Sequence, residues 1–85
     1  MAEVEFSDQA VDQLAALDPP VQERIVDKVE EATEWTEHRL KSLSGSEFYS
    51  LRAGDYRAII DWHRNDDVLV VIAVGHRRNV YDRYL

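Results

Sequence analysis

The sequence predicts a single α+β domain over residues 1–85, in which helices pack on one face of a mostly antiparallel sheet. Apolar residues recur at helical spacing in the first half of the chain, and branched and aromatic residues at strand spacing dominate the second half. Glycine and clusters of polar turn residues separate the expected strands. The expected order is a strand, a helical hairpin, a three-stranded antiparallel meander and a short C-terminal helix.

The first strand is expected over residues 3–6, and Ser7 is a suitable N-cap for a helix over residues 8–17. That helix should bury one stripe, formed by Val11, Leu14, Ala15 and Leu17. The prolines at 19 and 20 end this helix and begin the next, because proline is tolerated in the first helical turn.

The second helix should reach about Glu37, antiparallel to the first because the connection is short. Its expected core stripe consists of Val21, Ile25, Val29 and Ala32, with Val26 and Trp35 at the margin. Residues 38–46 are expected to form a loop that Leu40 and Leu43 attach to the core.

Residues 48–63 predict a β-hairpin around a short turn at 53–55. If Arg52 pairs with Asp55, Ser50 lies opposite Arg57. Strand residues alternate between faces, so one face should carry the core residues Tyr49, Leu51, Tyr56, Ala58, Ile60 and Trp62. The other face should carry Phe48, Ser50, Arg52, Arg57, Ile59 and Asp61, which places Arg57 on a surface opposite the core.

After a turn at residues 65–67, the run 68–74 is apolar on both faces and should be an interior strand. Gly75 should end it, and residues 76–85 should finish the chain as a loop and short helix. The longest apolar run is this one, whereas a membrane span needs roughly 20 residues. The start of the chain has no leader-like features, so the sequence favours a soluble, cytoplasmic protein, although the absence of cysteine leaves the redox compartment undecided.

The net charge of −7 alone argues against a nucleic-acid partner, but the charges are unevenly distributed. Residues 1–38 hold eleven acidic residues against two basic ones, a balance of −9. Residues 39–85 hold six acidic residues against eight basic ones, a balance of +2. The basic residues therefore gather in the expected sheet and C-terminal segment.

Four arginines, Arg52, Arg57, Arg77 and Arg78, lie in the hairpin and after the last strand. The planar fork of arginine matches phosphate oxygens, so such a cluster suits a phosphodiester. For each arginine alone, pairing with an acid such as Asp55 or Asp61 is the alternative.

His76 lies beside these arginines, and histidine transfers protons near neutral pH. A surface histidine with no role is an equal alternative. Tyr81 could stack on a base or simply anchor the last helix on the sheet. His38 and His63 are interpreted as structural. No histidine pair has metal-ligand spacing, so we expect neither a metal nor a cofactor.

The runs 51–60 and 68–78, with Val80 and Tyr81, resemble the RelE branch of the RelE/ParE toxins. The first strand, the helical hairpin and the Leu43–Gly45 segment extend the resemblance over essentially the whole chain. It implies a toxin of a type II toxin–antitoxin system that cuts messenger RNA in the ribosomal decoding site. Cleavage in that family needs no metal: the 2′-hydroxyl attacks the adjacent phosphate and leaves a cyclic phosphate.

By this resemblance, Arg57 corresponds to the hairpin arginine at the scissile phosphate and Arg77 to the arginine that stabilises transition-state charge. Tyr81 corresponds to the tyrosine that stacks on or orients the substrate, and Arg52 and Arg78 are further RNA-binding candidates. Well-studied members carry two lysines where this chain has Phe48 and Ser50. Arginine cannot easily accept a proton, which leaves His76 as the candidate base.

The main hypothesis is therefore a ribosome-dependent endoribonuclease toxin. The alternatives are a ParE-like toxin that poisons DNA gyrase, or a catalytically weak module that mainly binds an antitoxin. In each case the expected partner is a small antitoxin from the adjacent gene, forming a hetero-oligomer across the sheet and C-terminal region.

Overall fold

The computed structural model describes residues 2–43 and 45–84, the side chains of 81–84 excepted. The strands are β1 (Glu3–Phe6), β2 (Lys41–Ser42), β3 (Tyr49–Ala53), β4 (Tyr56–His63) and β5 (Val68–His76). The helices are α1 (Asp8–Ala15), α2 (Pro19–Glu31), α3 (Thr36–Arg39) and α4 (Arg77–Tyr84).

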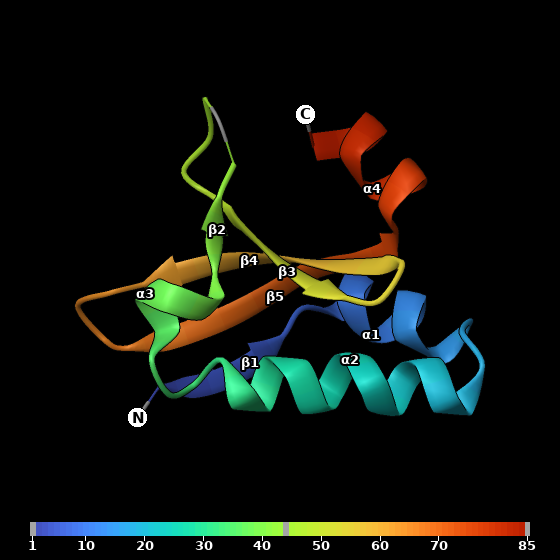
Figure 1. The fold of residues 1–85 in the computed structure, drawn as a ribbon, viewed down its shortest axis with the longest axis horizontal. Helices are drawn as coiled ribbons and strands as arrows, with labels where there is room; N and C mark the ends of the chain where they lie inside the picture. The colour runs from blue at the N-terminus through green and yellow to red at the C-terminus, as the bar shows by residue number, and fades with distance from the viewer. Residues whose placement is uncertain (1, 44, 85) are drawn as a thin grey trace.

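Within these residues the strands form one five-stranded sheet in the order β1-β5-β4-β3-β2 (Figure 1). β1 runs parallel to β5, and every other neighbouring pair is antiparallel. The α+β class, the meander of β3, β4 and β5, and the interior position of β5 are therefore confirmed.

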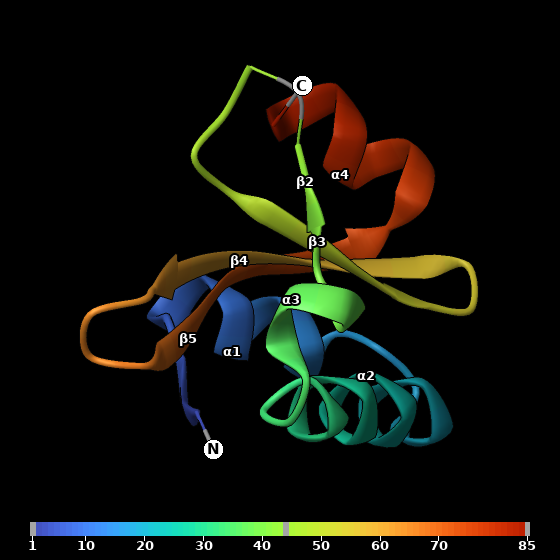
Figure 2. The ribbon, with the colours of Figure 1, turned by 60° about the vertical axis from the view of Figure 1, so that its left-hand side comes forward.

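Helices cover both faces of the sheet. The hairpin of α1 and α2 packs on one face, as predicted, whereas α4 lies across the other (Figure 2). No helix in the described part of the chain is long and apolar enough to cross a membrane.

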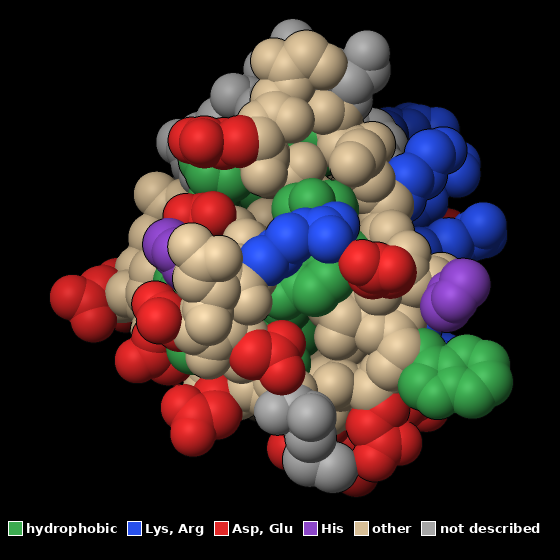
Figure 3. Space-filling model, turned by 90° about the vertical axis from the view of Figure 1, so that its left-hand side faces the viewer, with side chains coloured by type: hydrophobic (Ala, Val, Ile, Leu, Met, Phe, Trp, Pro, Cys, Tyr) green, Lys and Arg blue, Asp and Glu red, His purple; other side chains and the backbone are tan. Residues whose placement is uncertain are grey.

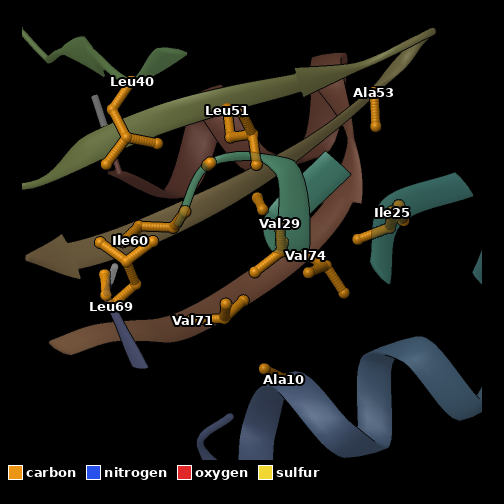
Figure 4. Packing of buried hydrophobic residues seen from close by; sticks show 13 residues of the cluster. Ala10, Ile25, Val29, Leu40, Leu51, Ala53, Ile60, Leu69, Val71 and Val74 are labelled. Carbon is orange, nitrogen blue, oxygen red and sulfur yellow. The ribbon is translucent and has the colours of Figure 1, made fainter. Parts of the chain in front are cut away.

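The main core lies between the sheet and the helical hairpin (Figure 4). Ile25 and Val29 of α2 are fully buried there against the facing side chains of the sheet. Those side chains include Leu51, Ala58, Ile60, Leu69, Val71 and Val74. The stripe predicted for α2 is thus confirmed, with Val21 only partly buried at its start.

A smaller core lies on the opposite face, under α4. It consists of Leu43, Ile59, Ala73 and Val80, with Phe48 and Ile72 packed against it. The face that the sequence predicts as open surface is therefore partly covered.

A β-bulge in β5 allows this strand to supply both cores. Ile59 pairs with Ala73 and Ile60 with Val71, so Ile72 is the extra residue. The bulge reverses the alternation, and Val71 and Val74 consequently face the same core although they are three positions apart.

Polar side chains from α1 and its N-cap complete the edge of β5 where β1 ends. β1 pairs with β5 only as far as Val71. Beyond that point the Ile72 carbonyl accepts from Ser7 Oγ at 3.0 Å and from Gln9 Nε2 at 3.2 Å, and the Val74 N–H donates to Gln13 Oε1 at 2.8 Å. These two backbone groups of β5 are thus satisfied without a longer β1.

The buried side of α1 differs from the prediction by one position. Ser7 caps the helix as expected, accepting from the Ala10 N–H at 3.1 Å. The fully buried residue is Ala10, whereas Val11 is 51% exposed and Ala15 is exposed. The small Ala10 side chain lets α1 approach β5 closely, and Leu14 and Leu17 complete the stripe.

The segment after α2 also differs from the prediction. α2 ends at Glu31 and not near Glu37, and Trp35, with φ of 55°, is the N-cap residue that precedes α3. The segment 38–46, predicted as a loop, contains the last two residues of α3 and the short edge strand β2, in which Lys41 and Ser42 pair with β3. Leu40 and Leu43 are buried, as expected.

The burial difference between α1 and α2 gives a stability prediction. Replacing fully buried Ile25 by alanine (Ile25→Ala) should lower the free energy of unfolding by about 2–5 kcal/mol, because it leaves a cavity in the main core. The matched surface change Val11→Ala should alter it by less than about 0.5 kcal/mol. Urea unfolding followed by circular dichroism would measure both, and equal losses would contradict the assignment of the α1 face.

Candidate functional site

The arginines gather at the end of the sheet that carries the β3–β4 turn. Ala53 pairs with Tyr56, so Gly54 and Asp55 form the turn and Arg52 lies directly opposite Arg57. The predicted pairing of Arg52 with Asp55 is therefore wrong by two positions. Gly54 takes φ of +64°, which glycine adopts without steric cost, and this favours the turn one residue later than predicted. A shift of two positions preserves the faces, so Arg52 and Arg57 still share one.

Arg57 is nearly buried, with 9% of its surface exposed. The sequence predicts an open position, and this is wrong because the face beneath α4 has its own core. The Nη1 atom of Arg57 donates to the Gly54 carbonyl and to the Tyr56 carbonyl, each at 2.9 Å. The backbone of its own turn therefore fixes the direction of this guanidinium.

Arg77 is joined to the same turn through its backbone. It is the first residue of α4, and its N–H donates to the Asp55 carbonyl at 2.9 Å. The side chains of Arg77 and Arg78 are exposed. Because the start of a helix carries partial positive charge, α4 adds to the cationic character of this corner.

His76 ends β5 opposite Tyr56, and the two rings meet edge to face with centroids 5.6 Å apart. Its Nδ1 accepts the Arg78 N–H at 3.3 Å. In the neutral ring, Nε2 therefore carries the proton and Nδ1 is the basic nitrogen. His76 could accept a substrate proton only by releasing the Arg78 amide.

Gly75 lets α4 lie close to the arginine row. It pairs with Arg57 across the β4–β5 ladder, so the row across the sheet reads Arg52, Arg57, Gly75. A Cβ at Gly75 would lie 2.8 Å from Cγ2 of Val80. The prediction that Gly75 ends the strand is wrong, because β5 continues to His76 and α4 follows directly. Here this glycine instead leaves the space that Val80 of α4 occupies.

A hollow of about 470 Å³ opens beside this contact, between the end of α1 and the start of α4. Its lining includes Tyr56, His76 and Asn79, together with the apolar side chains of Leu17, Val74 and Val80. The corner thus offers cationic groups outside and a partly apolar recess beside them.

The positions of the two expected lysines lie on the same face as Arg52 and Arg57. Ser50 is buried, with 5% exposure, and Phe48 packs against the small core. The structure therefore brings Arg52, Arg57, Arg77 and Arg78 to one corner. His76 ends β5 at this corner, but its ring lies against Tyr56 of the main core, on the opposite face of the sheet from Arg52 and Arg57. Neither Phe48 nor Ser50 adds a proton acceptor on the arginine face. The side chain of Tyr81 lies outside the described residues.

Comparisons with known proteins agree on one family. A model of the ParE toxin of type II toxin–antitoxin systems, from parDE, matches residues 4–81. Comparison with curated protein sequences finds no match.

Solved structures of RelE toxins share the fold. The E. coli toxin RelE in the free state, in a variant with two arginines replaced by alanine, is 27% identical with a TM-score of 0.78; the match covers 96% of this chain and 93% of that one. RelE in the intact E. coli RelBE toxin–antitoxin complex is 26% identical, with a TM-score of 0.74 over 89% of this chain and 96% of that one. The RelBE2 toxin–antitoxin complex from Mycobacterium tuberculosis has a TM-score of 0.82 at 23% identity, and the match covers 89% of this chain and 98% of that one. At this identity the likeness shows the fold alone.

The different settings of Arg57 and Arg77 predict different effects on stability. Arg57→Ala removes the donor to two turn carbonyls and should lower the free energy of unfolding by about 1–3 kcal/mol. Arg77→Ala keeps the backbone bond to Asp55 and should change it by less than about 0.5 kcal/mol. Thermal melts of both variants would test this, and a loss at Arg77 as large as at Arg57 would contradict it.

Proposed function

The chain belongs to the family of ParE toxins of type II toxin–antitoxin systems, and we propose that it acts in the manner of RelE, as a ribosome-dependent endoribonuclease that cuts messenger RNA and inhibits translation. The observation that carries this proposal is the corner where Arg52, Arg57 and Arg77 meet. The likeness to the E. coli RelE toxin supports the choice within the superfamily.

The placement of Arg52 opposite Arg57 favours an anionic ligand. Directly opposed strand residues lie about 5 Å apart at Cα, and like charges in that position repel. A phosphodiester would convert this repulsion into attraction, since each guanidinium can donate to phosphate oxygens. Exposed Arg52 and Arg77 can reach an RNA backbone, while Arg57 keeps a fixed direction beneath them.

In the proposed reaction the 2′-oxygen of a ribose attacks the adjacent phosphorus and the bond to the 5′-oxygen breaks. The 2′-hydroxyl loses its proton, the leaving oxygen gains one, and the products are a cyclic phosphate and a 5′-hydroxyl. Arg57 and Arg77 would stabilise the charge that grows on the phosphate oxygens. His76 would exchange the Arg78 amide for the proton of the 2′-hydroxyl, and Tyr81 would orient the substrate.

Two other functions have specific support. The matched family model describes ParE, which favours a toxin directed at DNA gyrase. Phe48 and buried Ser50, in place of lysines, favour a catalytically weak module that mainly binds an antitoxin.

A cognate antitoxin from the adjacent gene is part of the proposal under every one of these functions. The solved relatives include RelBE toxin–antitoxin complexes. An acidic, amphipathic antitoxin segment would suit the arginine corner and the recess below α4, covering Arg57 and Arg77 or displacing the helix that carries Tyr81.

Mapping transcript ends after a brief pulse of expression tests the proposal. Breaks in translated messages, at fixed positions within codons, are expected. DNA damage without such breaks would favour the gyrase toxin, and growth without either would favour the binding module.

The exposed position of Arg77 predicts a loss of activity without a loss of fold. Removing one donor to a developing charge costs about 10²–10³ in rate, so Arg77→Ala should slow cleavage of ribosome-bound message by that factor. Arg39→Ala, an exposed arginine of α3 outside the corner, is the control and should cleave as the unchanged protein does. Primer extension on purified ribosome complexes would measure both rates, and equal rates for the two variants would remove Arg77 from the site.

A further inference from the structure

At the opposite end of the strands from the arginine corner, two tryptophans and two acidic residues line a hollow of about 500 Å³. Trp35 and Glu37 come from the α2–α3 segment, Trp62 from β4 and Asp67 from the β4–β5 turn. Thr33, Thr36 and His38 complete the lining. Trp62 is five residues along β4 from Arg57, a separation of about 17 Å.

Trp35 is in a conformation and a setting that folding does not explain. Its φ of 55° and ψ of 41° are left-handed, which costs an ordinary residue roughly 1–2 kcal/mol. Glycine or asparagine usually occupies such a position between helices. The side chain is also 77% exposed, so its burial offsets little of the free energy that this backbone conformation costs. Strained, exposed residues of this kind cluster at binding sites.

The surroundings of Trp35 and Trp62 are suited to a cation. Aromatic faces and carboxylates together attract guanidinium and ammonium groups. The chain itself shows this chemistry next to the hollow, because the guanidinium of Arg64 lies 4.1 Å from the Trp62 ring centroid and donates to Glu37 at 2.9 Å. Figure 3 looks onto this end and shows acidic side chains around a small area of hydrophobic and basic surface.

We propose that this hollow binds an arginine or lysine side chain of the antitoxin, between Trp35 and Trp62 and close to Glu37 and Asp67. The inference rests on the proposed toxin function for its partner, and on charge complementarity for its chemistry. The positive charge of the arginine corner attracts an acidic segment of the partner, and the carboxylates of the tryptophan hollow attract a basic one. Two linked contacts at opposite ends strengthen each other, because binding at one end raises the effective concentration at the other.

Two variants separate this role from folding. Trp35→Gly removes the aromatic face and relieves the left-handed strain, so the melting temperature should be unchanged or higher. Val11→Ala is the matched control, since Val11 is the other large exposed hydrophobic residue among the described side chains. Both variants should still arrest growth when expressed without antitoxin.

The direct probe is N-acetylarginine amide, with N-acetylcitrulline amide as its uncharged counterpart. Both tryptophans of the chain line the hollow, so tryptophan fluorescence reports its occupancy. Saturable quenching by the arginine compound alone is expected in the unchanged protein and in Val11→Ala, and its loss in Trp35→Gly. Quenching that the citrulline compound reproduces, or that survives in Trp35→Gly, would overturn the cation site.

Titration with the antitoxin encoded beside the gene tests the occupant. Trp35→Gly should weaken binding about 10–100-fold, as truncation of a central aromatic contact does, and Val11→Ala should leave it unchanged. Unchanged binding by Trp35→Gly would overturn the antitoxin as occupant even if the probe binds. Because affinities are measured on purified proteins, this test of the hollow does not depend on whether the toxin cuts RNA. Loss of growth arrest in Trp35→Gly alone would instead place the hollow at the toxin's target.

Discussion

The pairing of β5 on both of its edges is the constraint on which the rest of the structure depends. β5 takes β1 in parallel on one side and β4 antiparallel on the other, and it contributes to the cores on both faces. Three polar side chains from Ser7 and α1 hold its free edge beyond β1. The strand therefore ends in a fixed place, with Gly75 beside Arg57 and Arg77 bonded to the turn of β3 and β4. The position of the arginine corner follows from this arrangement.

The bulge at Ile72 explains how one strand can serve two purposes. A regular strand that buries Val71 against the helices would turn Val74 toward α4. With the extra residue, Val74 stays in the main core and Ala73 and Gly75 face α4. These two small residues leave room for Val80, which brings α4 down onto the sheet. Bulges often re-aim side chains near functional sites, and here the bulge sets the face on which Arg57 and α4 meet.

Much of this could be predicted from the sequence because periodicity determines which residues face the core. The stripe of α2, the first strand and the interior strand all follow from apolar spacing. The short strand β2 could not be predicted, since Lys41 and Ser42 are exposed and join the sheet only through hydrogen bonds to β3. Val11 and Ala10 could not be distinguished by hydrophobicity either, because close approach of α1 to β5 favours the smaller residue.

The sequence indicates which arginines are candidates for the site, but not how each of them is placed. Arginine types and their spacing indicate a phosphate-binding corner, and the structure gathers the same residues. The burial of Arg57 depends on α4 closing a face that a two-stranded hairpin leaves open, which is a tertiary effect. The engagement of His76 Nδ1 by the Arg78 amide likewise depends on how α4 begins.

The two ends of the sheet have opposite chemistry, and this has a consequence for any partner. An acidic chain such as an RNA strand gains attraction at the arginine corner but meets carboxylates at the tryptophan end. A protein partner can carry both signs of charge and can match both ends at once. The extents of the molecule, 33 × 26 × 22 Å, mean that about ten extended residues suffice to reach from one end to the other. The charge distribution therefore favours the proposed nucleic-acid ligand at the arginine corner alone, whereas a protein partner with both signs of charge could contact both ends and exclude it.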